Sequence, residues 1–159
     1  MKKKEHIKMD SEKQAVYDFW DKFSCGEELY LKSTQQIGYD NQARSRYELE
    51  GDMIFPLARF SESKGLKVLE VGVGLGADHQ QFAEAGAELH GIDLTESAVE
   101  HTRKRLAYLG FESNLSVGDA EQLDFPDESF DLVYSWGVLH HSPNTQKAIS
   151  EVYRVLKQG

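Results

Sequence analysis

Residues 68–76 read Val-Leu-Glu-Val-Gly-Val-Gly-Leu-Gly, and this run constrains the fold more than any other part of the chain. Its apolar residues predict a buried β-strand that breaks into a loop with three alternating glycines. In open α/β sheets, loops of this kind bring backbone N–H groups against a nucleotide-like ligand. Gly72 and Gly74 can turn through conformations that a Cβ blocks, and Gly76 lets the following helix lie close to the strand. The alternative interpretation is an ordinary tight turn.

The composition indicates one soluble globular domain. The chain has 159 residues, of which 40% are hydrophobic and 28% are charged. Its 27 acidic and 18 basic side chains give a net charge of −9, which repels phosphate backbones, so we expect no nucleic-acid partner. We expect no membrane insertion, because no apolar stretch approaches the roughly 18 residues that a span requires. Cys25 is the single cysteine, which excludes an internal disulfide and predicts a cytoplasmic location.

The residue pattern changes near residue 65, from polar and aromatic residues at helical spacing to alternating strand and helix patterns. We expect an N-terminal helical extension over residues 1–64 and a sheet domain over residues 65–159. The first helix is expected to be capped by Ser11. Its apolar positions at helical spacing are Ala15, Val16, Phe19, Trp20 and Phe23.

The rest of the extension predicts a loop followed by a second helix. The loop covers residues 30–40, and the helix covers residues 41–61, with a kink or break at Pro56. The apolar residues on one side of this helix are Tyr47, Ile54, Leu57 and Phe60.

Strand and helix patterns alternate from Leu66 onward, which predicts right-handed βαβ units and a mostly parallel, Rossmann-like α/β sheet with helices on both faces. The expected strands are residues 67–71, 88–92, 114–117 and 131–135. The expected helices are residues 78–85, a segment capped by Thr95 and ended by Gly110, and a segment introduced by Pro143-Asn144. The buried face of the last helix is expected to hold Ala148, Ile149, Val152, Val155 and Leu156.

An acidic residue follows the second expected strand. Asp93 lies 19 residues after Gly74, where a carboxylate can accept hydrogen bonds from both hydroxyls of a ribose. Alone, Asp93 could equally cap the next helix. Together with the glycine loop, it favours either a dinucleotide or S-adenosylmethionine as the ligand. The dinucleotide fingerprint Gly-x-Gly-x-x-Ala is also satisfied, because Ala77 follows the loop.

The charges beside the glycine loop favour the second ligand. Glu70 precedes the loop and Asp78 begins the following helix. A pyrophosphate bound at that helix N-terminus would meet two carboxylates, whereas a sulfonium and an ammonium group would be attracted to them.

Residues 65–159 resemble the class I S-adenosylmethionine-dependent methyltransferases, and are most similar to the small-molecule branch that includes ubiquinone and menaquinone C-methyltransferases. The motifs that carry the resemblance are Glu70-x-Gly72-x-Gly74-x-Gly76, Asp93, Gly118-Asp119-Ala120-Glu121-x-Leu123 with Phe125-Pro126, residues 130–135, Leu139-His140-His141, and Val155-Leu156-Lys157 with Gly159. They occur in the family's order and spacing. The Asn-Pro-Pro-aromatic motif of adenine and glutamine N-methyltransferases is replaced by Ser135-Trp136-Gly137, which favours a small-molecule acceptor.

The resemblance implies a role for each matching residue. The glycines would wrap the methionine part of the cofactor, and Glu70 would orient the loop or reach the cofactor's amino group through water. Asp93 would bind the ribose, and Leu94 would pack on the adenine. The adenine amino group would donate to Asp119, with the Ala120 N–H nearby. Residues beside the methionine end and the acceptor pocket would be Ser135 and Trp136.

Methyl transfer needs few protein groups, because alignment and exclusion of water do most of the work. His140 and His141 are the candidate bases for an acceptor that must lose a proton. The alternative is that one histidine packs against the sheet or caps a helix while the other is solvated. No further ligand falls at metal-binding spacing, so we expect no metal site.

The N-terminal helices are expected to fold over the cofactor as a lid, as such segments often do in this family. The aromatic residues that could supply the surface are Trp20, Tyr30, Tyr39 and Tyr47. The alternative is that they only pack the helices onto the sheet.

The chain ends where the family continues with further strands. The expected strand order is therefore 3-2-1-4, with an apolar fourth strand at the edge that invites self-association. We expect a C-terminally truncated methyltransferase whose cofactor residues are present and whose acceptor pocket is not. The alternatives are a non-catalytic S-adenosylmethionine-binding or interaction fragment, and an NAD-dependent oxidoreductase.

Overall fold

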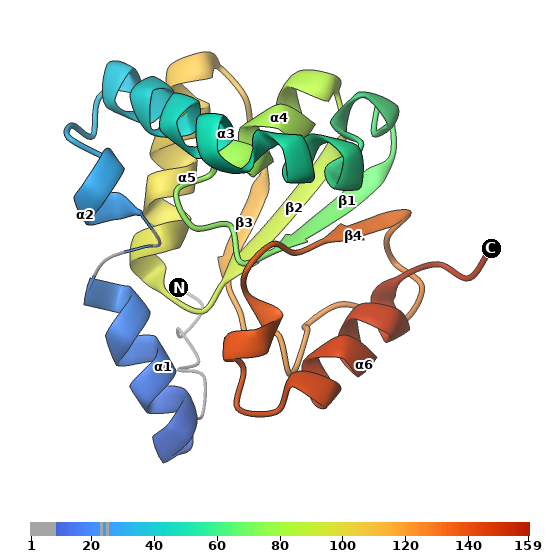
Figure 1. The fold of residues 1–159 in the computed structure, drawn as a ribbon. Coiled ribbons are helices and arrows are strands. Elements are labelled where there is room, and N and C mark those ends of the chain that lie inside the picture. The colour runs from blue at the N-terminus through green and yellow to red at the C-terminus, as the bar shows by residue number, and fades with distance from the viewer. Residues whose placement is uncertain (1–8, 23, 25) are drawn as a thin grey trace, which may run out of the picture.

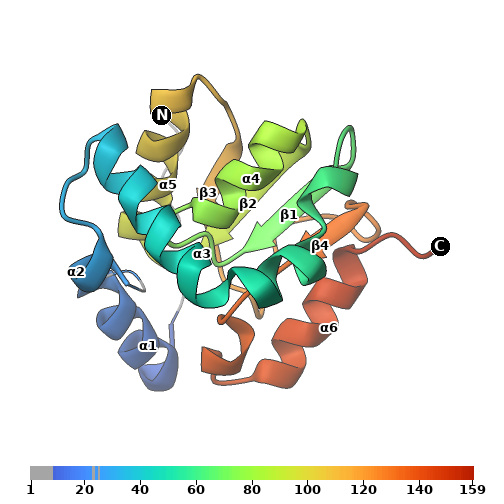
Figure 2. The same cartoon turned by 45° about the horizontal axis from the view of Figure 1, so that its top comes forward.

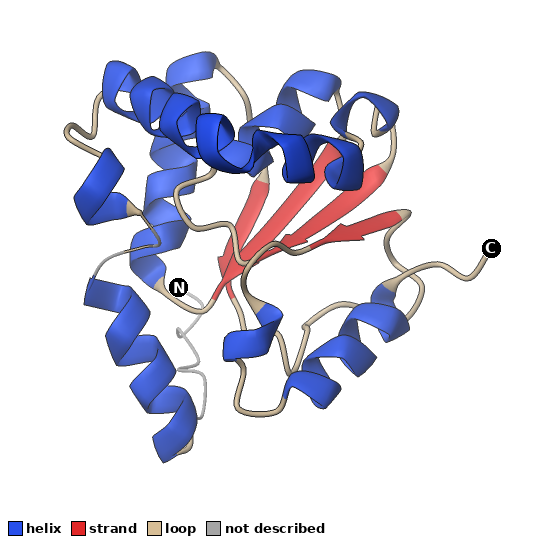
Figure 3. Cartoon of the chain, in the orientation of Figure 1, coloured by secondary structure: helices blue, strands red, loops and turns tan. Residues whose placement is uncertain are grey.

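A parallel four-stranded sheet lies at the centre of the structure, a computed structural model that describes residues 9–22, 24 and 26–159. The strands are β1 (Lys67–Val71), β2 (Glu88–Asp93), β3 (Asn114–Val117) and β4 (Leu132–Tyr134). Their order is β3-β2-β1-β4, as predicted, and β4 pairs only with β1 among the named strands (Figure 1, Figure 3). The predicted Rossmann-like arrangement is confirmed.

Helices follow β1, β2 and β4 and begin and end close to where the sequence predicts. They are α4 (Ala77–Ala85), α5 (Glu96–Leu109) and α6 (Thr145–Val155). The Thr95 hydroxyl accepts from the Ala98 N–H at the start of α5, and the Asn144 side chain accepts from the Lys147 N–H at the start of α6. These local signals are strong because each satisfies a helix-end N–H that has no partner within the helix.

Three further helices precede the sheet in the chain. They are α1 (Ser11–Lys22), α2 (Glu27–Tyr30) and α3 (Gln36–Ala58). Figure 2 shows α3 running across the same side of the sheet as α4 and α5, whereas α1 lies beyond the carboxyl ends of the strands. The division of the chain at residues 64 and 65 stays a prediction.

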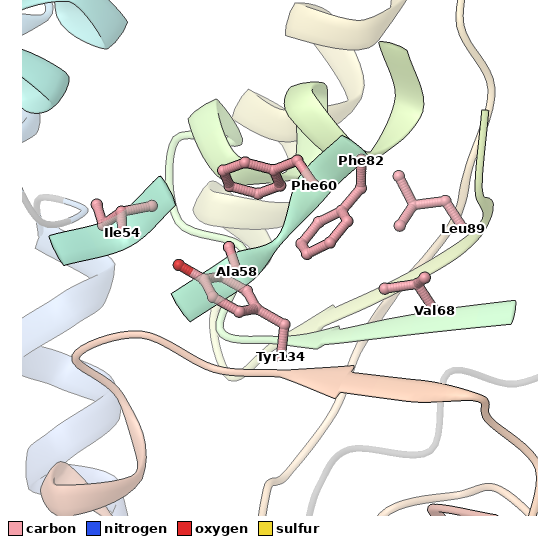
Figure 4. Close-up of a cluster of buried hydrophobic side chains, with 7 residues drawn as sticks. All are labelled: Ile54, Ala58, Phe60, Val68, Phe82, Leu89 and Tyr134. Carbon is pink, nitrogen blue, oxygen red and sulfur yellow. The ribbon is translucent and has the colours of Figure 1, made fainter. Parts of the chain in front are cut away.

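The core has two parts, one on each face of the sheet. One part joins α3, α4 and a short 3₁₀ helix, η1 (Phe60–Glu62), to the sheet through Ile54, Ala58, Phe60, Val68, Phe82, Leu89 and Tyr134 (Figure 4). The other joins α6 to the opposite face through Leu69, Val71, Ile92, Leu123, Phe130 and Val155. Val68 and Leu69 belong to different parts because successive strand residues point to opposite faces. Helices therefore cover both faces, as predicted.

The N-terminal helices depart from the sequence-based expectation. Tyr30 ends α2 and α3 begins at Gln36, so residues 30–40 are not wholly a loop. Pro56 does not break α3, because the helix ends two residues later, where Arg59 adopts a left-handed conformation (φ 51°). A proline in the last turn removes one N–H and leaves the rest of the helix intact. Leu57 is 61% exposed, so it does not share the buried side with Ile54.

The packed faces of α1 and α6 also differ from the prediction. Phe19 of α1 is 68% exposed, and the buried residue of this helix is Lys13. Phe23 and Cys25 lie outside the described residues. The side chain that accepts from the Lys13 N–H at the start of α1 is that of Asp10, so Ser11 is the first helical residue and not the cap. In α6, Ala148 and Val155 are buried, but Ile149 is 48% exposed.

We expect Phe82→Ala to destabilise the protein by about 3–5 kcal/mol, because it leaves a cavity among the rings of Phe60 and Tyr134. The ring of Phe82 is fully buried. Urea denaturation followed by circular dichroism measures the change. Tyr153→Ala, at a side chain 65% exposed, is the control and should change stability by less than about 0.5 kcal/mol. Equal losses in the two variants would contradict the assigned core.

Candidate functional site

A pocket of about 230 Å³ opens where the carboxyl ends of the strands meet. Its walls come from the loops after all four strands and from α1 and α3. Ligands of open α/β sheets bind at this edge, where the connections diverge to the two faces. The predicted residues that line the pocket are Glu70, Gly72, Gly74, Gly76, Asp93, Leu94, Asp119, Ala120, Trp136 and His141.

The glycine loop forms the floor of the pocket. Gly72, Gly74 and Gly76 have φ values of 86°, 51° and 76°, in the left-handed region that favours glycine. A Cβ on Gly72 would lie 2.2 Å from a methyl carbon of Val138, and one on Gly76 would lie 2.8 Å from Oγ1 of Thr102 in α5. The close approach at Gly76 is therefore to α5. A Cβ on Gly74 would meet nothing within 4 Å, so this glycine borders open space.

Asp93 is bound to the glycine loop. Its Oδ2 accepts from the Gly74 N–H (3.1 Å), and its Oδ1 accepts from the N–H and the hydroxyl of Thr95 (3.0 Å each). Burial raises the pKa of Asp93, although these hydrogen bonds act in the opposite direction. The helix-cap role is thus taken by Thr95, and Asp93 holds the loop and the pocket edge together.

Glu70 lies beneath the loop in contact with a buried histidine. Nδ1 of His79 is 2.8 Å from the Glu70 carboxyl group, and Nε2 is 2.8 Å from the Ser113 hydroxyl. Burial lowers the pKa of His79 to about 3, so the ring is neutral. Burial and the nearby Asp78 raise the pKa of Glu70 well above its usual value. The contact is therefore a hydrogen bond to a neutral ring and not an ion pair.

Asp78 is not a free anion beside the glycine loop, which corrects the expectation from the sequence. Arg46 of α3 donates to both oxygens of Asp78 (2.7 and 3.3 Å), and the hydroxyls of Tyr47 and Tyr134 donate to them as well (3.0 and 2.9 Å). Burial and the neighbouring carboxylate raise the pKa of both tyrosines, which keeps them protonated as donors. The Asp78 charge is balanced by Arg46, so it does not by itself exclude an anionic ligand.

Asp119 lies at the other end of the pocket and binds a lysine from α1. Its Oδ2 accepts from the Lys13 ammonium (2.5 Å), and its Oδ1 accepts from the Glu121 N–H (2.9 Å). The same ammonium donates to Glu121 Oε2 (3.0 Å). This lysine was not among the predicted site residues, because a single cation in an amphipathic helix is usually a solvated residue.

The segment after β4 contributes unequally to the pocket. The Ser135 hydroxyl donates to the Val71 carbonyl (2.9 Å), and Ser135 is not among the lining residues. The Trp136 indole does line the pocket and donates to Glu50 (3.2 Å). Val138 closes this side above Gly72.

The two candidate histidines lie in different positions. His141 lines the pocket and its ring packs edge-on against Trp20 of α1 at 5.1 Å between centroids. Burial and the neighbouring His140 lower the pKa of His141. Both side chains are exposed, and His140 does not line the pocket. The catalytic role of either histidine stays a prediction.

Only Trp20 among the four candidate lid aromatics lines the pocket. Tyr39 is 1% exposed and bonds His101 (2.9 Å), and Tyr47 bonds Asp78. For Tyr39 and Tyr47 the packing alternative is therefore the better description.

α3 supplies a polar stripe that sequence analysis missed. Gln42, Arg46 and Glu50 recur every fourth residue and all line the pocket. The stripe is fixed by Arg105 of α5, which is 2% exposed and donates to Gln42 (2.8 Å), to the Tyr39 carbonyl (2.9 Å) and to the glycine-loop carbonyl of Leu75 (3.0 Å). Polar residues at this spacing usually face water, so these three can be identified as pocket residues only from the packing of α3 in the structure.

The pocket therefore combines a bare backbone loop, carboxylates at two edges and an aromatic end. These features fit S-adenosylmethionine. Gly74 leaves room for a ligand against the backbone, and Oδ2 of Asp93 and both carboxyl oxygens of Asp119 each accept one bond from the protein, which leaves each a lone pair for a hydroxyl or amino donor. Among the described residues, no group of three or more His, Cys, Asp or Glu side chains is placed to hold a metal ion.

Residues 69–159 match the methyltransferase domain family. The chain belongs to this family of S-adenosylmethionine-dependent methyltransferases. The predicted cofactor and the class I assignment are thereby confirmed, whereas the finer resemblance to the quinone C-methyltransferases is not distinguished by the match.

Known relatives extend the similarity into the N-terminal helices. A sterol 24-C-methyltransferase of Yarrowia lipolytica is 38% identical over 147 residues, which are 91% of this chain and 37% of that protein. Phosphoethanolamine N-methyltransferase 2 of Caenorhabditis elegans is 37% identical over 106 residues, which are 65% of this chain and 24% of that protein. The chain thus spans about a quarter to two fifths of the length of these two relatives.

A solved structure supports the fold. The magnesium protoporphyrin IX methyltransferase of Synechocystis, determined with bound S-adenosylmethionine, aligns with a TM-score of 0.70 over 94% of this chain and 74% of its own. At 20% identity this similarity establishes the fold alone. Within the part of the chain that the structure describes, no helix is long and apolar enough to cross a membrane.

The neutral state of His79 gives a pH prediction. Its pKa is about 3 in the folded chain, against about 6.5 when unfolded, so the unfolded state binds the extra proton. The stability that His79 contributes is therefore present above pH 6.5 and is lost as the pH falls toward 3. We expect the ring nitrogen NMR shifts of His79 to stay constant between pH 7 and 5. A titration of that ring near pH 6 would contradict the assignment.

Proposed function

We propose that this methyltransferase domain binds S-adenosylmethionine in the pocket and transfers its methyl group to an apolar small molecule. The observation that carries the proposal is the hydrogen bond between the Gly74 N–H and Asp93, which joins the glycine loop to a ribose-binding carboxylate in one pocket. The family match supports the cofactor, and the wall composition supports the acceptor class.

The cofactor residues follow from the two edges of the pocket. In this proposal Asp93 binds the ribose, Asp119 accepts from the adenine amino group, and the glycine loop lies along the methionine part. Arg46 is a lining cation at the loop end, and each of its terminal nitrogens carries a second proton besides those given to Asp78 and Glu50. It is therefore suited to the carboxylate of the methionine part.

The acceptor end is apolar and aromatic. Val16 and Trp20 of α1 face this end together with Trp136 and Val138 from the segment after β4. Such walls exclude water and suit a flat or branched apolar body, as in a quinone or a sterol, better than a multiply charged one. The relatives' names cover both carbon and nitrogen acceptors, and we propose carbon or oxygen as the methylated atom because the Asn-Pro-Pro-aromatic motif is absent.

The chemistry requires little of the protein beyond alignment. When bound, S-adenosylmethionine supplies an electrophilic methyl group on a sulfonium sulfur. The aromatic walls hold the acceptor in line and keep water out. His141 is neutral near pH 7 because its pKa is lowered, so the ring is able to accept a proton from an acidic acceptor.

The binding part of the proposal is tested with Asp93→Asn. The change removes the charge that accepts from the ribose, and we expect the affinity for S-adenosylhomocysteine to fall about 10- to 150-fold, the equivalent of a charged hydrogen bond. Isothermal calorimetry measures it. Asp124→Asn, at an exposed loop position outside the pocket, is the matched control and should leave the affinity unchanged. Binding of NAD in place of S-adenosylhomocysteine would refute the proposal.

The catalytic part is tested at the paired histidines. With a phenol-like or other proton-bearing acceptor found in a metabolite extract, His141→Gln should lower transfer of labelled methyl about 100-fold or more and remove the acidic limb of the pH profile. His140→Gln, whose ring lies outside the pocket lining, should retain the rate, with the acidic limb displaced to higher pH because His140 no longer lowers the pKa of His141. Labelling by wild type and equal rates in both variants would exclude histidine as the base. Binding without any labelling would favour a non-catalytic cofactor-binding fragment.

A further inference from the structure

Lys13 is the lining cation at the adenine end of the pocket. Its side chain is 10% exposed, and its ammonium group lies 2.5 Å from Asp119 and 3.0 Å from Glu121. Both carboxylate side chains are similarly buried: Asp119 is 12% exposed and Glu121 is 8% exposed. Two carboxylates within 3.0 Å of one nitrogen repel each other unless a cation lies between them.

The hydrogen bonds around the pair leave Asp119 able to accept more. Its Oδ1 receives the Glu121 N–H and its Oδ2 receives Lys13, so each oxygen retains one lone pair. Glu121 also accepts one bond at each oxygen: its Oε2 receives Lys13, and its Oε1 receives the Asn144 N–H at the start of α6 (2.9 Å). Asp119 lines the pocket and Glu121 does not, so Asp119 is the member of the pair that is open to a ligand.

We propose that Lys13 is a positioning residue of the cofactor site, whose ammonium holds the Asp119 carboxylate in the orientation that accepts the adenine amino group. The inference rests on the proposed function for the role of Asp119. It adds a residue from outside the matched family segment, since Lys13 precedes residue 69 by several helices.

The same helix carries this contact to the acceptor end. Lys13, Val16 and Trp20 are spaced three and four residues apart, and all three line the pocket. Trp20 packs on the His141 ring. Helix α1 therefore links Asp119, through Lys13, to Trp20. The contact at the adenine end of the pocket thus also positions the aromatic side chain of Trp20 at the acceptor end.

Lys13 is the cation that the two carboxylates share. Without it, Asp119 and Glu121 face each other with no cation between them, and their repulsion turns the Asp119 side chain away from its present orientation. The Asp119 carboxylate is then no longer aimed at the adenine amino group.

The experiment measures the affinity for S-adenosylhomocysteine by calorimetry at about pH 7. We expect Lys13→Met to bind about tenfold more weakly or worse, because Asp119 is no longer held in place. Lys13→Met with Glu121→Gln removes one of the two repelling charges and should recover part of the affinity. Lys13→Arg retains the charge and should bind within about threefold of wild type. The matched control is Lys22→Met, at an exposed lysine of the same helix, which should behave as wild type.

Carboxyl carbon NMR of the ligand-free protein provides a second readout. The Asp119 carboxyl signal should move in Lys13→Met and stay near its wild-type position in Lys13→Arg. Wild-type affinity in folded Lys13→Met would overturn the inference, and so would tighter binding, which would mean that Lys13 competes with adenine. If wild type binds no S-adenosylhomocysteine, the proposed function fails, while the NMR result still decides whether Lys13 positions Asp119.

Discussion

The buried guanidinium of Arg105 is the contact on which the rest of the site depends. It donates to α3 through Gln42 and the Tyr39 carbonyl, to α4 through Gln80 (2.7 Å), and to the glycine loop through Leu75. A buried cation must have its donors satisfied, so α3, α4, α5 and the loop are held in one relative position. The stripe of α3 that faces the pocket is placed by this single side chain.

Acids from the sheet domain and bases from the N-terminal helices balance one another across the pocket. Arg46 of α3 neutralises Asp78 beside the loop, and Lys13 of α1 lies between Asp119 and Glu121 at the opposite end. Burying a carboxylate raises the free energy of the folded state unless a cation lies near it. The helices that precede the sheet are therefore part of the site electrostatically and not only a cover over it.

Local signals in the sequence were sufficient for the sheet and its connections. The β1 run, the Thr95 and Asn144 caps and the terminating glycines each act within a few residues, and the structure follows them closely. The N-terminal helices were predicted less well. Their faces are decided by distant partners: Tyr39 is buried against His101 and Arg105, and Lys13 is buried against Asp119, so neither follows from apolar spacing along its own helix.

Patterns in the sequence predicted the fold class and the glycine loop with Asp93, and the resemblance to the methyltransferases supplied the strand order. A parallel sheet brings the residues that follow its strands to one edge. Which charges are free at that edge depends on partners that the folded chain brings together from distant positions. Asp78 and Glu70 looked alike in the sequence, yet one is balanced by Arg46 and the other contacts neutral His79. The physical reason is that the energy of a charge depends on burial and on partners that are far away in the chain, and neither can be read from the residue type or its neighbours.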